Sequence, residues 1–209
     1  MNLPLGARLW IADAPKDPKG MILICPGGGY QWLSPREAQP VAHAFTAAGW
    51  AAAVVYYTIR EKPGQPPLGT LPVRQLGEAL QTMQQRFPAL SALVCGFSAG
   101  GHLAASYGVF WKKKTFLAEE LGVDAEQLRP NGLLLSYPVI TSGPKAHRGS
   151  FTNLLGDRYD ELVDEMSLEN QVSLDTPKTF LWHTAPDDCV PVENSILFFT
   201  ALHALEIPV

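Results

Sequence analysis

Short runs of apolar residues alternate along this chain with longer stretches in which apolar residues recur at helical spacing. Five strong runs predict buried β-strands, and a weaker run near 8–11 predicts a sixth. The strong runs are 21–25 (MILIC), 51–56 (AAAVVY), 91–95 (SALVC), 131–137 (NGLLLSY) and 178–182 (KTFLW). Strands that alternate with helices in this way predict a mostly parallel sheet with helices on both faces.

The first predicted helix has a recognisable start and end. Residues 34–37 (SPRE) have the pattern of a capping box with proline at the first helical position. In such a box the Ser34 hydroxyl and the Glu37 carboxylate would each accept a hydrogen bond from a free backbone N–H. Val41, Phe45 and Ala48 then recur at helical spacing, and Gly49 ends the helix.

Three more helices are predicted from similar signals. One follows Pro72 with an apolar stripe and cannot extend past Pro88, and another runs from Ala99 to about Trp111. The last begins near Pro191. The stripe after Pro72 consists of Val73, Leu76, Leu80 and Met83, and the last helix is expected to bury Ile196, Phe199 and Leu202.

Two segments depart from this alternation. Residues 61–71 (EKPGQPPLGTL) predict a loop rich in proline and glycine. Residues 138–177 are too many for an ordinary connection between strands, which indicates a lid-like excursion over the carboxyl end of the sheet, helical around 159–166. With 209 residues, the chain fits one domain, 1–209.

Composition narrows the class of protein. Charged residues make up 17% of the chain, below the roughly 25% of a typical domain, which suits a sheet covered on both faces. The net charge of -4 argues against binding to nucleic acid. No apolar run reaches the ~18 residues of a membrane span, and residues 1–4 (MNLP) do not resemble a signal peptide, so the default expectation is a cytoplasmic protein with no membrane partner.

The three cysteines are odd in number and widely spaced. That pattern fits neither a disulfide framework nor a zinc site. Cys25 and Cys95 end two predicted strands and are expected to be buried and reduced.

Residues 96–100 (GFSAG) match G-x-S-x-G between a predicted buried strand and a predicted helix. This context is typical of a nucleophile elbow, a sharp turn that holds a serine hydroxyl out at the carboxyl end of a sheet. The alternative is a glycine-rich turn that happens to contain a serine. The context favours Ser98 as a catalytic nucleophile.

A second motif, residues 26–30 (PGGGY), leaves the strand at 21–25. Glycines there would let backbone N–H groups approach a developing oxyanion, and Gly28, Gly29 and Ala99 are the expected oxyanion donors. A phosphate-binding loop is the rival interpretation, but no G-K-[ST] sequence follows. Tyr30 is expected to line the substrate pocket.

Two acidic residues follow the last strand, Asp187 and Asp188. In enzymes built around a nucleophile elbow, the catalytic aspartate follows the serine along the chain and orients a catalytic imidazole. Asp187 lies at the position expected for this aspartate. Asp188 is the other candidate for this role. Its alternative interpretation is a solvated loop carboxylate or a residue at the start of a helix.

No histidine follows Asp187 at a useful position. His203 is expected on the surface of the last helix, and His102 in a structural hydrogen bond inside the helix after Ser98. His183 could approach the site from the end of its strand. His147 either lines the substrate pocket or is a plain residue of the excursion.

Taken together, these segments resemble the acetyl esterase and xylan esterase-like branch of the α/β-hydrolases. The matching stretches follow in order over nearly the whole chain: 25–45 (CPGGGYQWLSPREAQPVAHAF), 95–106 (CGFSAGGHLAAS), 136–140 (SYPVI), 147–156 (HRGSFTNLLG) and 176–202 (TPKTFLWHTAPDDCVPVENSILFFTAL). The resemblance implies an α/β-hydrolase three-layer sandwich and assigns the aspartate of the D-x-x-V-P stretch, here Asp187, to the catalytic triad. Proline at 186 departs from the acidic residue that the family often has there.

The family's histidine lies about thirty residues beyond that aspartate, in a loop after one more strand. This sequence has no matching position, so the last strand of the fold and the triad base are expected to be missing. The uncovered sheet edge would favour association into oligomers.

The resemblance implies a serine esterase that acts on short-chain (acetyl) esters, including acetylated sugars or xylan fragments, without metal or organic cofactor. Residues 1–209 alone are expected to turn over slowly because the base is absent. Three alternatives remain: a peptidase of the same fold, a non-catalytic protein that binds an acylated ligand, and a structural protein in which Ser98 is buried away from the 26–30 loop.

Overall fold

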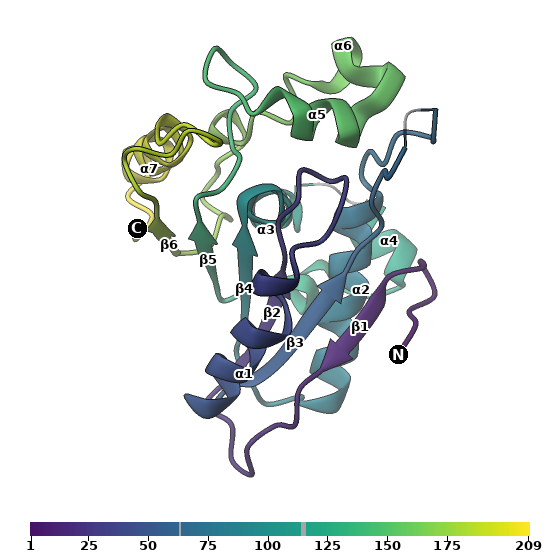
Figure 1. Cartoon of the computed structure of the whole chain (residues 1–209). Coiled ribbons are helices and arrows are strands. Elements are labelled where there is room, and N and C mark those ends of the chain that lie inside the picture. Colours follow the sequence, from purple (N-terminus) through teal and green to yellow (C-terminus); the bar gives the residue numbers. More distant parts are fainter. Residues whose placement is uncertain (63, 114–115) are drawn as a thin grey trace.

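The computed structural model describes residues 1–62, 64–113 and 116–209, which form a six-stranded sheet with helices on both faces (Figure 1). The strands lie in the order β1-β3-β2-β4-β5-β6, and only β1 runs antiparallel to its neighbour. Their bounds are β1 Arg8–Ile11, β2 Met21–Cys25, β3 Ala51–Tyr56, β4 Ala92–Phe97, β5 Gly132–Ser136 and β6 Thr179–Trp182. All six expected strands are present, and the mostly parallel α/β sheet is confirmed.

The register of the central strands determines which loops meet. In the pairing of β2 with β4, Cys25 lies opposite Gly96, so the two parallel strands end at the same edge of the sheet. The segments that follow them, 26–30 and 98 onward, therefore emerge side by side. Cys25 and Cys95 are buried and unpaired in these two strands, as expected.

Within the described residues, α-helices and short 3₁₀ turns connect the strands, and one further helix follows the last strand. The helices are α1 Gln39–Ala47, α2 Leu71–Arg86, α3 Ser98–Phe110, α4 Phe116–Leu121, α5 Arg148–Leu155, α6 Tyr159–Leu162 and α7 Glu193–Ala204, and the 3₁₀ turns are Pro35–Glu37, Ala125–Leu128, Gly156–Arg158 and Leu168–Asn170. Helix α1 packs on one sheet face, and α2 and α3 pack on the other. Over the described ranges, no helix has both the length and the apolar character that a bilayer crossing requires.

The apolar stripe of α2 is buried as expected, whereas the capping box before α1 does not form. A 3₁₀ turn, Pro35–Glu37, comes first, and α1 starts only at Gln39. The Ser34 side chain makes no capping bond, and its buried hydroxyl has no partner within the described residues. The Glu37 carboxylate turns instead toward the loop after β2 and accepts a hydrogen bond from the Gly27 N–H.

The prediction of which face of α7 is buried is also wrong in part. Leu202 is buried, but Ile196 is 53% exposed and Phe199 is 45% exposed. The buried stripe consists of Asn194, Ser195, Phe198 and Leu202. This stripe turns inward because two of its members are polar groups with partners in the core: Asn194 accepts from the Ile140 and Thr141 N–H groups, and Ser195 pairs with His183.

The excursion 138–177 lies beyond the carboxyl ends of the strands, with α5 and α6 at its outer side (Figure 1). Its longest helix is α5, which the apolar pattern did not predict, whereas the helix expected around 159–166 is only Tyr159–Leu162. At the other end of the order, β6 is an edge strand. Its side chains Phe180 and Trp182 are 62% and 49% exposed, and within the described residues no helix covers them on the α1 side.

Candidate active site

Ser98 occupies a turn without connecting residues, because β4 ends at Phe97 and α3 begins at Ser98. Its φ of 52° lies in the left-handed region, which costs a residue with a side chain free energy and is found where the surrounding structure enforces it. The side chain is partly exposed. The turn therefore presents the Ser98 hydroxyl at the carboxyl edge of the sheet.

The two glycines that flank the serine are required by close backbone approach. A Cβ on Gly100 would lie 2.1 Å from the Cys25 carbonyl oxygen, and a Cβ on Gly96 would lie 2.2 Å from the Gly100 carbonyl oxygen. Neither contact can be relieved by moving a side chain. The glycines at both ends of 96–100 thus allow α3 to start directly against the end of β2.

The triple-glycine loop lies against this turn. A Cβ on Gly27 would come within 2.9 Å of the Ser98 Cβ. Gly28 and Gly29 have φ values of 131° and 64°, conformations that glycine adopts without strain. Ser98 therefore lies against the 26–30 loop and is not buried away from it. This position argues against the alternative of a purely structural protein.

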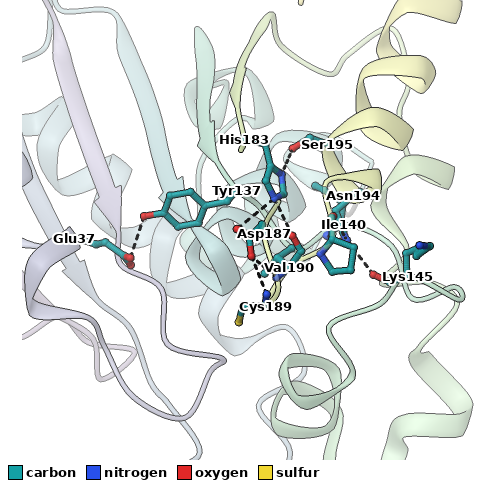
Figure 2. A network of polar contacts seen from close by, with 11 residues as sticks. Glu37, Tyr137, Ile140, Lys145, His183, Asp187, Cys189, Val190, Asn194 and Ser195 are labelled. Carbon is teal, nitrogen blue, oxygen red and sulfur yellow. Dashed lines mark hydrogen bonds and ion pairs between the residues drawn. The ribbon is translucent and has the colours of Figure 1, made fainter. Parts of the chain in front are cut away.

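Glu37 fixes this loop, and it is a site residue that the sequence interpretation missed. Its carboxylate accepts from the Gly27 N–H at 2.7 Å. It also accepts from the Tyr137 hydroxyl at 3.1 Å (Figure 2). Burial and the neighbouring carboxylate raise the pKa of Tyr137 above its usual range. Nothing in the local sequence signals this contact, because Tyr137 follows Glu37 by a hundred residues.

Asp187 lies in the turn between β6 and α7, in the same cavity as Ser98. Its Oδ1 accepts from the Cys189 N–H at 2.9 Å and from the Val190 N–H at 2.8 Å, and its side chain is 19% exposed (Figure 2). Asp188 is exposed and does not line that cavity. Of the two candidates, only Asp187 lines the cavity that contains Ser98.

His183 braces the Asp187 turn. Its Nε2 donates to the Val190 carbonyl oxygen at 2.9 Å and lies 3.6 Å from Asp187 Oδ2. Because that carbonyl can only accept, the proton is on Nε2, and Nδ1 accepts from the Ser195 hydroxyl at 2.8 Å. Both ring nitrogens are occupied and the side chain is 3% exposed, so His183 is placed to hold the turn rather than to deprotonate Ser98.

His147 lines the cavity and also begins helix α5. Its Nδ1 accepts from the Ser150 N–H at 3.3 Å and lies 2.9 Å from the Ser150 hydroxyl. Since Nδ1 is an acceptor, neutral His147 carries its proton on Nε2. Nε2 is therefore a hydrogen-bond donor and does not offer the lone pair that a general base would need.

The expectation that Tyr30 lines the pocket around Ser98 is wrong. Its side chain is 1% exposed and lies by a separate cavity of about 260 Å³. There the Tyr30 hydroxyl donates to His102 Nδ1 at 2.9 Å, because His102 Nε2 donates to the Met166 carbonyl oxygen at 3.0 Å. His102 therefore has the structural role expected of it, and burial lowers its pKa to about 4.

The cavity around Ser98 has a volume of about 440 Å³. Of the sequence-predicted site residues it brings together five: Ser98, Gly28, Gly29, Asp187 and His147. Ala99 is fully buried behind Ser98, and His203 is exposed on α7 as expected. In the described part of the chain, no hydrogen bond joins a histidine to the Ser98 side chain.

Comparison with known proteins points to one family. The family model described as BD-FAE matches residues 9–202. The structure is similar to that of an acetyl ester-xyloside bifunctional hydrolase from Caldicellulosiruptor lactoaceticus, with a TM-score of 0.81 and 33% identity over 98% of this chain and 76% of that one. It is also similar to the carboxylesterase Cest-2923 from Lactobacillus plantarum, with a TM-score of 0.76 and 26% identity over 97% and 75% of the two chains.

A curated relative is much longer. Endo-1,4-beta-xylanase B from Butyrivibrio fibrisolvens is 36% identical over 194 residues, which cover 90% of this chain. The match spans only 30% of the length of that protein.

Proposed function

We propose that this chain, which belongs to the BD-FAE family of α/β-hydrolases, is a serine esterase that removes acetyl groups from small esters. Acetylated sugars or xylan fragments are the proposed substrates, since the similar proteins include a xylanase and an acetyl ester-xyloside hydrolase. The observation that carries the proposal is the contact between the strained Ser98 turn and the triple-glycine loop in one cavity.

In the proposed reaction, the Ser98 oxygen attacks the ester carbonyl carbon while the serine proton passes to a base. The tetrahedral intermediate then collapses, the C–O bond to the alcohol breaks, and the alcohol leaves with a proton. Water attacks the acyl-serine in the same way and releases acetate and the free hydroxyl.

The N–H groups of Gly28, Gly29 and Ala99 are the proposed donors to the oxyanion. Ala99 lies in the first turn of α3, where backbone N–H groups have no acceptor within the helix and the helix dipole favours negative charge. Gly28 and Gly29 line the cavity beside Ser98. Donors fixed before the reaction lower its barrier, and the loss of one costs ~10²–10³ in rate.

Asp187 is proposed to orient a catalytic imidazole and to stabilise its cation. The five histidines of this sequence do not supply that imidazole where they lie, because His147 and His183 each use Nδ1 as an acceptor, His102 is buried against Tyr30, and the other two, His43 and His203, are exposed outside the cavity. Slow turnover is therefore expected for residues 1–209, because none of these histidines is placed to take the Ser98 proton.

Initial rates on a panel of substrates test the reaction class. We expect acetate release from ethyl acetate and from peracetylated xylose, no cleavage of peptide amides, and no activity above background for Ser98→Ala. Cleavage of the amides in preference to the esters would favour a peptidase of the same fold. Equal ester hydrolysis by Ser98→Ala would refute the proposal.

Chemical rescue tests the missing base. Free imidazole in the buffer should accelerate ester hydrolysis by the wild-type chain in a saturable way and should not accelerate Ser98→Ala beyond the uncatalysed reaction. Rapid turnover of the wild-type chain without imidazole would contradict the expectation of slow turnover.

A further inference from the structure

Trp32 is the most exposed aromatic side chain at the cavity that contains Ser98. Its exposed fraction is 53%, and it lines that cavity together with Gly28 and Gly29. Within the described residues its indole has no aromatic or cation-π partner. An exposed indole without such a partner leaves a large apolar face available for a ligand.

The position of the indole is fixed relative to the proposed oxyanion donors. The Trp32 N–H donates to the Gly28 carbonyl oxygen at 3.1 Å. A Cβ on Gly28 would lie 2.1 Å from the Trp32 carbonyl oxygen and 3.2 Å from its Cδ2, so the indole lies in contact with Gly28. A group stacked on this ring would be adjacent to an ester carbonyl held at Gly28 and Gly29.

A hydrogen-bond donor lies near the next glycine. The His147 ring is held by Ser150 through Nδ1, which leaves its Nε2–H as a donor at the cavity, and its Cε1 would lie 4.0 Å from a Cβ on Gly29. Asn153 fixes that glycine, because its Nδ2 donates to the Gly29 carbonyl oxygen at 2.8 Å. The rigid glycine loop thus has an indole at Gly28 and an oriented polar donor at Gly29.

We propose that Trp32 and His147 form a subsite for the pyranose ring on the alcohol side of the ester. The C–H groups on one face of a pyranose would stack on the indole ring, because the face of an aromatic ring is electrostatically negative. A sugar oxygen would accept a hydrogen bond from His147 Nε2–H. The subsite rests on the proposed function for its position next to the ester. Binding of the sugar itself does not need the chemistry at Ser98.

Equilibrium binding of xylobiose to Ser98→Ala, followed by calorimetry, tests the subsite without hydrolysis. We expect saturable binding that is weakened about tenfold by Trp32→Ala and much less by Trp32→Phe, which keeps a ring. His147→Asn keeps a helix-capping side chain but removes the Nε2 donor, and it should weaken binding about threefold. Phe199→Ala, which removes an exposed ring on α7 outside the cavity, is the matched control and should bind as tightly as its parent.

The absence of saccharide binding by Ser98→Ala, or binding unchanged by Trp32→Ala, would overturn the subsite. Saccharide binding without any ester hydrolysis by the wild-type chain would refute the proposed function and leave the subsite standing.

Kinetics with two esters provide the second readout. Trp32→Ala should raise KM for peracetylated xylose about tenfold, with kcat nearly unchanged, and should lower kcat/KM for ethyl acetate much less than that for peracetylated xylose. An equal loss on both esters would mean that Trp32 only supports the glycine loop, and it would contradict a role in sugar recognition.

Discussion

The Glu37 carboxylate connects the glycine loop after β2 to Tyr137 at the end of β5. It accepts the Gly27 N–H, which would otherwise be buried without a partner. Because Gly27 lies next to Ser98 and directly before Gly28, this single bond orients the main chain that faces the serine. Glu37 acts on the proposed reaction through the loop, as a positioning residue.

Replacing Glu37 should therefore impair activity more than an ordinary surface change. Glu37→Ala is expected to lower kcat by about tenfold to a hundredfold, because small shifts of catalytic groups have effects of that size. It should also lower the free energy of unfolding by about 1–3 kcal/mol through the unsatisfied Gly27 N–H. Ester hydrolysis and urea denaturation measure the two effects, with Glu61→Ala, an exposed carboxylate, as control. Wild-type kcat in Glu37→Ala would show that the loop holds its conformation without the carboxylate.

His102 should make the folded state sensitive to acid. It is fully buried and neutral, and its pKa is lowered to about 4, whereas an unfolded histidine titrates near 6.5. Between these two values the unfolded chain binds a proton that the folded chain does not, so the stability contributed by neutral His102 is present above pH 6.5 and is lost as pH falls toward 4.

The loss amounts to about 3 kcal/mol over this range. His102→Gln should show a correspondingly flatter stability profile between pH 7 and 4, measured by urea unfolding. His203→Gln, an exposed histidine on α7, should keep the wild-type slope. An identical slope in wild type and His102→Gln would mean that His102 does not carry this dependence.

At the scale of elements, the parts of the site that follow from neighbouring residues could be predicted from the sequence. The apolar run that leads into residues 96–100 predicted the strand, the turn and the helix. This prediction was possible because the two glycines of the turn are required by steric contacts close to them in the fold. The cap at Ser34 and the inward face of α7 could not be predicted in this way. In both places polar side chains take partners that are distant in sequence, Glu37 with Tyr137 and Asn194 with Ile140, and tertiary contacts override the local pattern.

The glycine requirement at the start of α3 has a direct test in stability. Gly100→Ala should lower the free energy of unfolding by at least about 3 kcal/mol, because its methyl group would meet two carbonyl oxygens of the main chain at 2.1 and 2.4 Å. Gly149→Ala in α5 is the matched control, since its Cβ would make only an ordinary contact at 3.6 Å. Its stability should be unchanged or raised by about 0.5–1 kcal/mol. Equal effects of the two substitutions in thermal or urea unfolding would contradict the close approach of α3 to β2.

At the scale of the whole molecule, helices cover the sheet unevenly. On the α1 side, the described residues leave Phe180 and Trp182 of β6 exposed. Beyond β6, the Thr179 N–H donates to the Pro208 carbonyl oxygen. An edge strand with exposed apolar side chains is a site for pairing with another chain. The alternation of strands and helices predicted the sheet, but a pattern of apolar residues does not say which part of a face has a covering partner.

We therefore expect self-association through β6. The average mass in light scattering should rise with protein concentration, and Phe180→Lys should reduce this rise, because a charge on an edge strand opposes pairing. Leu174→Lys, which changes a side chain that is 82% exposed outside the strand, should associate as the wild type does. A monomer at all concentrations, or an equal effect of both substitutions, would exclude β6 as the interface.

A catalytic role for Ser98 depends most on the reactivity of its hydroxyl, held at the bend between β4 and α3. Treatment of the folded chain with an organophosphonate in buffer that contains imidazole as the base, followed by intact mass and peptide mapping, measures it directly. A single adduct at Ser98 is expected, absent in Ser98→Ala and slower to form in Glu37→Ala, where the glycine loop has lost its anchor. No adduct, or an adduct on another serine, would contradict a nucleophilic Ser98 and favour a non-catalytic protein that keeps the cavity for binding.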